Sequence, residues 1–193
     1  MAKKIVFIQG SPRKNGNTRA MTNIAMAAAK RHGAEVTEID ATTLEFKVPG
    51  CMGCRKCQET EEFKCVVDDG VARAVATLGM YDAVILATPL FWWSYSAQLK
   101  IFIDRMFSTS KVNDPQNYRS LLAGKTFGLL ATAGGPVEEN LEVLELQWKN
   151  PALMMGSPFT SCLFPNTSPE PGVLSKDPAA VQKAEDFGRS LAL

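Results

Sequence analysis

Hydrophobic positions along the chain follow two alternating patterns. Short, largely apolar runs such as Lys4–Gln9 and residues 83–87 have the composition of buried strands. Between such runs lie longer stretches, such as residues 17–32, in which apolar side chains recur three or four positions apart. Strands that alternate with amphipathic helices are typical of a parallel sheet covered by helices on both faces. The pattern therefore predicts an α/β fold of three layers.

The same patterns predict the remaining elements. We expect further strands at Glu35–Asp40, Thr126–Thr132 and Phe159–Phe164. Helices are expected from a cap at Asp68-Asp69 to about residue 78, over residues 136–148 and 178–191, and from a start at Ser94 or Ser96. Residues 42–64 lack a clear period, and a long loop of this kind in a compact domain usually carries a function. Residues 166–176 are a loop by their proline and glycine content.

Composition narrows the class of protein. At 193 residues the chain suits one domain, which we place at residues 1–193 with a cysteine-rich insertion at about 42–66. Its 21 Lys and Arg against 20 Asp and Glu provide no positive field for nucleic acid. The apolar stretch 83–93 is interrupted by Thr88 and Pro89 and is too short to span a bilayer, so no membrane span is expected. Five cysteines without an export signal indicate a reducing, cytoplasmic location.

Residues 10–18, which read Gly-Ser-Pro-Arg-Lys-Asn-Gly-Asn-Thr, join the first strand to the first helix. Free backbone N–H groups and the positive end of a helix can bind phosphate at such a junction. Polar donors, a glycine that permits close approach and a cation are present, at Ser11, Arg13, Asn15, Gly16, Asn17 and Thr18. The alternative is an ordinary turn with an Asn or Thr helix cap. Because the loop lacks Gly-x-Gly-x-x-Gly and Gly-Lys-Ser/Thr, a monophosphate is favoured over a dinucleotide or a nucleoside triphosphate.

Two later segments accompany this loop. Thr88-Pro89-Leu90-Phe91-Trp92 is followed by Ala97-Gln98-Leu99-Lys100 and Asp104-Arg105, and Thr132-Ala133-Gly134-Gly135 comes after the next strand. Together, within residues 4–135, the three segments resemble the NADPH-dependent FMN reductase-like group of flavodoxin-fold proteins. The resemblance implies a flavodoxin-like three-layer sandwich with a five-stranded parallel sheet in the order 2-1-3-4-5, and FMN bound at the carboxyl ends of its strands.

In this group the ribityl phosphate lies on the first loop and the isoalloxazine ring rests against the other two. The resemblance therefore implies as FMN-binding residues Ser11, Arg13, Asn15, Gly16, Asn17, Thr18, Pro89, Leu90, Phe91, Trp92, Thr132, Ala133, Gly134 and Gly135. Phe91 and Trp92 are expected to stack on the ring, with core or interface packing as the alternative. The group often has a tyrosine where Phe91 stands, so a hydrogen bond from that hydroxyl is absent here. Gly134 and Gly135 either bring backbone amides close to the ring or make a tight turn.

The insertion contains four cysteines within a stretch of 15 residues, at Cys51, Cys54, Cys57 and Cys65. Three thiols spaced three apart, with a fourth farther on, can converge on one iron–sulfur cubane. Zinc is less favoured, because its structural sites usually use two separated Cys-x-x-Cys pairs and the single histidine of the chain is His32. The alternatives are reduced thiols that pack a loop, or a redox-active Cys-x-x-Cys pair.

The cysteine pattern, with Asp68-Asp69 after it, resembles the iron–sulfur flavoproteins, a branch of the same group. This resemblance implies a [4Fe-4S] cluster held by the four cysteines beside FMN. It also implies a homodimer or homotetramer, because in that branch cluster and ring come from adjacent subunits. The seven residues before Cys65 place the final gap at the long end of the branch's pattern.

These features predict an FMN-dependent oxidoreductase. We expect it to accept hydride from NAD(P)H and to pass electrons through the cluster to a quinone, a small molecule or a protein such as ferredoxin. Because the flavin carries that chemistry, no catalytic acid or base is expected among the side chains. The alternatives are a cluster-free NAD(P)H-dependent FMN or quinone reductase, a flavodoxin-like electron carrier, and a non-enzymatic metal sensor.

Overall fold

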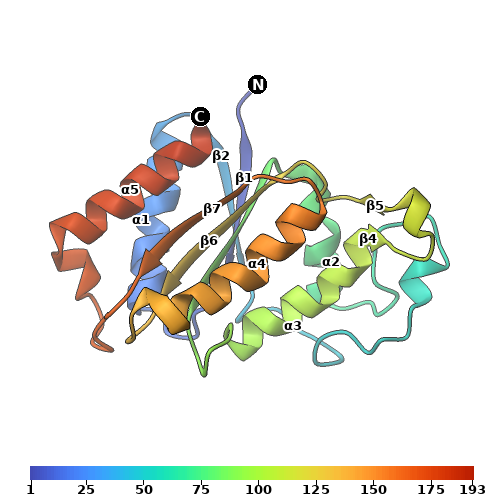
Figure 1. The fold of residues 1–193 in the computed structure, drawn as a ribbon, viewed down its shortest axis with the longest axis horizontal. Coiled ribbons are helices and arrows are strands. Elements are labelled where there is room, and N and C mark those ends of the chain that lie inside the picture. Colours follow the sequence, from blue (N-terminus) through green and yellow to red (C-terminus); the bar gives the residue numbers. More distant parts are fainter.

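The computed structural model describes the backbone of residues 1–193 and every side chain except that of Pro115. Its centre is a sheet of five parallel strands in the order β2-β1-β3-β6-β7 (Figure 1). The strands are β1 (Lys4–Gln9), β2 (Glu35–Asp40), β3 (Ala83–Pro89), β6 (Thr126–Thr132) and β7 (Phe159–Phe164). Because β4 and β5 belong to a separate hairpin, β6 and β7 are the fourth and fifth strands of this sheet. The order is therefore the 2-1-3-4-5 of a flavodoxin-like fold, and the predicted topology is confirmed.

Helices cover both faces of the sheet (Figure 1). On one face lie α1 (Asn17–Arg31) and α5 (Pro178–Ala192), and on the other lie α2 (Gly70–Ala76), α3 (Ala97–Arg105) and α4 (Glu142–Met154). Successive side chains of a strand point to opposite faces, so each strand feeds two cores. In β1, Ile5 and Phe7 are buried on the side of α1 and α5, whereas Val6 and Ile8 are buried on the side of α2, α3 and α4. The three predicted layers are therefore confirmed.

Shorter elements complete the fold. Two short strands, β4 (Ser110–Lys111) and β5 (Arg119–Ser120), pair antiparallel beyond α3. Single 3-10 turns lie at Lys56–Gln58, Leu78–Met80, Met106–Thr109, Pro115–Asn117 and Leu174–Lys176. The sequence pattern does not predict the β4-β5 hairpin, because strands of two residues have no measurable period. Among the described helices, none has the length and apolar composition needed to cross a membrane.

Polar side chains determine where two of these helices begin. Asp69 precedes α2 and its carboxylate accepts a hydrogen bond from the amide of Ala72 at 2.9 Å. Ser96 precedes α3 and its hydroxyl oxygen accepts from the amide of Leu99 at 3.2 Å. Each bond satisfies an amide that has no partner within the helix. The predicted Asp cap is thus confirmed, and Ser96 rather than Ser94 is the cap of α3.

The helix predicted at residues 136–148 is correct in existence but not in form: a kinked π turn occupies Val137–Leu141, and the regular α-helix α4 runs from Glu142 to Met154, beyond the predicted end. It cannot extend to an earlier start, since Glu139 has a φ of 55° and lies in the left-handed region. The carbonyl of Glu139 accepts a hydrogen bond from the indole of Trp93 at 2.9 Å. That contact joins two loops that are distant in sequence, so no local pattern predicts it.

The insertion occupies residues 41–69, between β2 and α2. The regular secondary structure described within it is a single 3-10 turn at Lys56–Gln58. It lies beside the β4-β5 hairpin and the last turn of α3, on the right of the sheet in Figure 1. Hydrogen bonds to these elements, rather than an internal period, determine its shape.

Candidate functional site

A hollow of about 360 Å³, here named the strand-end hollow, opens at the carboxyl ends of the central strands. It is lined by Ser11, Arg13, Gly16, Asn17, Thr18, Pro89, Leu90, Phe91, Thr132, Ala133, Gly134, Thr167, Ser168 and Pro169. These residues come from the ends of β1, β3, β6 and β7 and from the loops that follow them, at one edge of the sheet. A volume of this size suits a small-molecule cofactor.

Most of the FMN-binding residues expected from the sequence line the strand-end hollow. The exceptions are Asn15, Trp92 and Gly135. Asn15 is exposed on its loop. Gly135 belongs to the turn behind the hollow, where its carbonyl accepts a hydrogen bond from the amide of Asn166 at 2.8 Å. The three predicted loops therefore meet in one place, although three of their residues do not form its wall.

The first turn of α1 contributes backbone N–H groups to this wall. The residue before the helix is Gly16, and no described side chain caps the helix. The alternative of a turn closed by an Asn or Thr cap is thus not the conformation of this loop. A Cβ at Gly16 would lie 3.0 Å from Cβ of Arg13 and 3.2 Å from its carbonyl oxygen, so the tight loop favours glycine. Uncapped amides at a helix N-terminus attract an anion.

The loop after β7 is a fourth wall that the sequence analysis missed. Asn17 holds it in place, because its side-chain amide donates to the carbonyls of Ser168 at 3.0 Å and Glu170 at 2.8 Å. Its amide oxygen accepts from the amide of Leu174 at 3.3 Å. Asn17 was expected to donate to phosphate, but both of its N–H groups are engaged within the chain. The one signal in the sequence for this wall is that the loop follows the last strand of the same sheet.

Charge and polarity are distributed unevenly around the hollow. Arg13 is the one charged residue among the described side chains that line it. Its exposed guanidinium donates to the carbonyl of Pro169 at 3.0 Å. Leu90, Phe91 and Ala133 supply apolar wall on the other side. A cation and free amides beside an apolar wall fit a phosphate joined to a flat apolar group.

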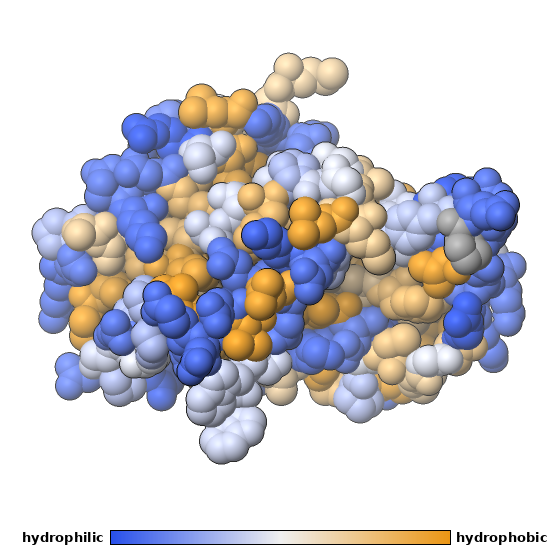
Figure 2. Space-filling model, viewed as in Figure 1, coloured by the Kyte–Doolittle hydropathy of each residue, from blue (hydrophilic) through white to orange (hydrophobic). Residues whose placement is uncertain are grey.

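A strained aromatic turn forms the rim of the hollow. Phe91 and Ser94 exchange backbone hydrogen bonds of 2.9 and 3.0 Å, and Trp92 and Trp93 between them have φ angles of 49° and 54°. Two successive left-handed residues define a type I′ turn, which normally selects Asn and Gly. The turn projects from the lower edge of the molecule (Figure 2), and Trp92 is 89% exposed. Phe91, rather than Trp92, therefore belongs to the wall in this conformation.

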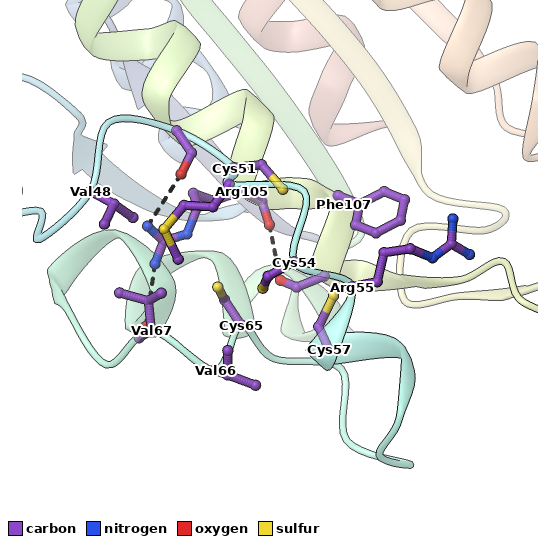
Figure 3. A pocket seen from close by; sticks show the side chains of 13 residues that line it. Val48, Cys51, Cys54, Arg55, Cys57, Cys65, Val66, Val67, Arg105 and Phe107 are labelled. Atoms are coloured by element: carbon purple, nitrogen blue, oxygen red, sulfur yellow. Dashed lines mark hydrogen bonds between the residues drawn. The ribbon is translucent and has the colours of Figure 1, made fainter.

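A second and smaller hollow, the cysteine hollow, is lined by Cys51, Cys54, Cys57 and Cys65 (Figure 3). Cys51 and Cys54 are exposed, Cys65 is half-buried and Cys57 is buried, and all four thiols are free. No group of three or more described Cys, His, Asp or Glu side chains is arranged to hold a single metal ion. A cubane has an iron at each of four separate corners, so it needs thiolates that surround a volume rather than one point. The four cysteines supply the thiolates that a cubane requires, and they line a hollow of about 20 Å³, so the ligand set fits the cluster and the cysteines would have to move apart to admit it.

A buried ion pair stands at the wall of the cysteine hollow. Arg105 lines the hollow, and its guanidinium lies 3.0 Å from the carboxylate of Asp69, with both side chains 1% exposed. Burial by itself raises the pKa of Asp69, but hydrogen bonds from the amides of Ala72 and Lys47 and the charge of Arg105 together hold it below its usual value. The carboxylate that caps α2 therefore also neutralises a cation in the wall of the cysteine hollow.

Helix α3 connects the two hollows. At its start the hydroxyl of Ser96 donates at 2.6 Å to the carbonyl of Gly10, the first residue of the loop at residues 10–18. At its end Arg105 lines the cysteine hollow. A Cβ at Gly10 would lie 2.7 Å from Cβ of Leu99, so glycine is what lets α3 pack this closely. The nine residues of α3 separate the two ends by roughly 12 Å.

A family model described as NADPH-dependent FMN reductase matches residues 3–150. An iron–sulfur flavoprotein of Archaeoglobus fulgidus is 35% identical over 132 residues, which are 68% of this chain and 55% of the relative. An iron–sulfur flavoprotein of Methanocaldococcus jannaschii is 35% identical over 102 residues, which are 53% of this chain and 51% of the relative. The chain thus spans about half the length of these curated relatives.

Solved structures with the same fold include flavin enzymes. An NAD(P)H:quinone oxidoreductase from Methanothermobacter marburgensis superimposes with a TM-score of 0.74 at 16% identity, over 99% of this chain and 100% of that one. An FMN-dependent NADH-azoreductase from Bacillus anthracis, solved in complex with FMN, has a TM-score of 0.72 at 12% identity, over 98% of this chain and 100% of that one. At these identities the likeness establishes the flavodoxin-like fold alone.

Proposed function

We propose, because this chain belongs to the NADPH-dependent FMN reductase family, that it is an FMN-dependent oxidoreductase which takes reducing equivalents from NAD(P)H. The observation that carries the proposal is the strand-end hollow, in which the uncapped start of α1 and the cation of Arg13 face an apolar wall. A nucleotide of one phosphate needs both features, and the loop lacks the motifs of dinucleotide and triphosphate sites.

Three groups of residues would hold FMN. The phosphate would lie among Ser11, Arg13, Gly16 and the first amides of α1. Pro89, Leu90 and Phe91, with Thr132, Ala133 and Gly134, line the part of the hollow left for the ring. Asn17 acts indirectly, by holding the loop at residues 167–169 that closes the fourth side.

FMN, once bound, supplies the chemistry by accepting hydride from a nicotinamide and releasing electrons singly or in pairs. The work of the chain is to bind and orient it. The segments that end β3 and β6 are joined at the ring wall, since Leu90, directly after β3, donates its amide to the carbonyl of Thr132 at 2.8 Å. The aromatic turn at residues 91–94 contributes Phe91 to the wall and exposes Trp92 and Trp93 beside it, where a second substrate would approach the ring.

The finer proposal is that Cys51, Cys54, Cys57 and Cys65 bind a [4Fe-4S] cluster. Two observations support it: the four cysteines line one hollow, and the curated relatives are named iron–sulfur flavoproteins. Electrons would then pass to a quinone, another small molecule or a protein such as ferredoxin. The two hollows share none of their described lining residues and lie at opposite ends of α3, so a homodimer or homotetramer that pairs the sites of two chains is part of the proposal.

A joint assay tests these proposals. Protein purified without oxygen should contain FMN, about four irons and sulfide per chain, and a flavin that NADPH or NADH bleaches. Cys54→Ala should lose the iron, while Cys162→Ala, at a buried cysteine on β7 away from the insertion, should retain it. Protein that stays colourless after addition of FMN would refute the oxidoreductase. Flavin without iron would favour the cluster-free reductase, and a flavin reduced only by a donor protein would favour the electron carrier.

A further inference from the structure

Two buried cations, Arg105 and Lys111, hold the cysteine insertion by its carbonyl groups. Arg105 donates from one guanidinium nitrogen to the carbonyl of Val67 at 3.2 Å and from the other to that of Gly50 at 3.5 Å. These two contacts fix the ends of the segment that carries the cysteines. Lys111, on strand β4, holds its middle.

Lys111 makes every contact that an ammonium group can make. Its Nζ atom donates to the carbonyls of Cys57 at 2.6 Å, Thr60 at 2.5 Å and Glu62 at 2.7 Å. An ammonium has three donors, so all three are used. The side chain is 7% exposed, and its Nζ atom lies 5.2 Å from the centre of the Phe63 ring. The backbone that carries Cys57 is therefore tied directly to this cation.

The two cations differ in their charge balance. Arg105 is neutralised by Asp69. Lys111 forms no ion pair with a carboxylate among the described side chains, although the run that supplies its acceptors also contains Glu59, Glu61 and Glu62. Of these glutamates, Glu61 pairs with Arg119 and Glu62 pairs with Lys64. The positive charge of Lys111 thus lies buried next to Cys57 without an ion-pair partner in contact, and the carboxylates of Glu61 and Glu62 act on it only at longer range.

Burial of a charge costs free energy, which hydrogen bonds to carbonyls offset in part and an anion close by offsets further. A cubane with four thiolate ligands carries net negative charge, and that charge is one of the factors that set its reduction potential. We propose that Lys111 is a positioning residue of the cluster site, which orients Cys57 through its carbonyl and offsets the negative charge of the cluster. The inference rests on the proposed [4Fe-4S] cluster.

Three variants separate geometry from charge. Lys111→Met removes both the donors and the charge. Lys111→Gln keeps two amide donors for the carbonyls but removes the charge. Lys125→Met is the matched control, because Lys125 also donates to backbone carbonyls, those of Gly79 at 2.9 Å and Tyr81 at 2.5 Å, and lies outside the cysteine hollow.

Each protein is purified anaerobically with FMN, and three quantities are measured: iron per flavin, the rate at which a chelator removes iron, and the midpoint potential of the cluster by electron paramagnetic resonance. Loss of a residue that supports a metal ligand typically weakens metal retention 10–100-fold. Lys111→Met should therefore release iron at least about tenfold faster than the wild type. Lys111→Gln should retain more iron but titrate at a lower potential, because its cluster lacks the offsetting charge.

FMN content serves as the internal control for folding, since the strand-end hollow shares no described lining residue with the cysteine hollow. Iron retention and potential in both Lys111 variants equal to those of Lys125→Met would overturn the inference. So would loss of flavin together with iron in Lys111→Gln, because Lys111 would then support the whole fold. A wild-type protein with FMN and no iron refutes the proposed cluster itself, and this inference with it.

Discussion

The hydroxyl oxygens of Thr18 and Thr132 lie 2.7 Å apart in the wall of the strand-end hollow and share one hydrogen bond. Thr18 lies in the first turn of α1 and Thr132 ends β6, and 114 positions separate them in the sequence. Both are buried, with 3% and 6% exposure. The bond joins the phosphate loop to the loop after the fourth sheet strand, so it fixes the distance between two walls of the proposed FMN site.

Replacing either threonine by valine should destabilise the protein. Valine keeps the shape but leaves the other hydroxyl buried without its partner, which costs about 1–3 kcal/mol of the free energy of unfolding. The double variant Thr18→Val/Thr132→Val should cost less than the sum of the single variants, because no hydroxyl is then left unpaired. Urea unfolding of the four FMN-free proteins measures this cycle. Additive single effects would mean that the two hydroxyls do not interact.

Arg13→Gln should weaken FMN binding roughly tenfold, or about 1.4 kcal/mol, by removing the cation that lines the hollow. Riboflavin lacks the phosphate, so its affinity should change little. Lys14→Gln is the matched control, since Lys14 is a neighbouring exposed cation that does not line the hollow. Fluorescence titration with FMN and riboflavin gives the four affinities. An equal loss for both flavins would argue against a phosphate contact.

The aromatic turn should become more stable when its strain is relieved. A left-handed conformation costs a residue other than glycine about 1–2 kcal/mol. Trp92→Gly should therefore raise the free energy of unfolding by about 1 kcal/mol, since Trp92 is exposed. Trp93→Gly should leave it nearly unchanged, because it also loses the hydrogen bond to Glu139, which contributes roughly 1 kcal/mol. A destabilised Trp92→Gly, measured by urea unfolding, would show that the indole has a packing role.

Acid should unfold the protein partly through Asp69. The pKa of this carboxyl is lower in the folded chain than in the unfolded one. Its contribution to stability is therefore complete above the unfolded pKa of about 4 and is lost as the pH falls through the folded pKa. Asp69→Asn should flatten the decline of stability below about pH 4, and should cost about 3–5 kcal/mol at pH 7 by leaving Arg105 without its partner.

Asp186→Asn is the control for this pH experiment. Asp186 forms a surface ion pair with Arg189, both about half exposed, and such pairs contribute roughly 0–1 kcal/mol. Urea unfolding between pH 3 and 7 compares the two variants with the wild type. Equal acid slopes in Asp69→Asn and the wild type would show that other carboxyls govern the acid transition.

Much of the fold could be predicted because its signals are local. The period of apolar residues locates all five sheet strands, and the residues between β1 and α1 predict a phosphate loop without tertiary information. The spacing of the cysteines is likewise a local property. The bounds of α4 were wrong, because Glu139 is held in the left-handed region beside an indole from a different loop.

The sequence by itself determined the order of the elements, the candidate loops and the chemistry that their side chains offer. Only the tertiary structure decided that Trp92 lies outside the wall, that the loop at residues 167–169 closes the hollow, and that Lys111 holds the backbone of Cys57. Every residue type has a backbone carbonyl that can accept a hydrogen bond. A hydrogen bond to such a carbonyl therefore places no demand on the identity of the accepting residue, and the sequence does not reveal it. Lys111 and Cys57 are 54 positions apart, and only the packing of β4 against the insertion brings them together.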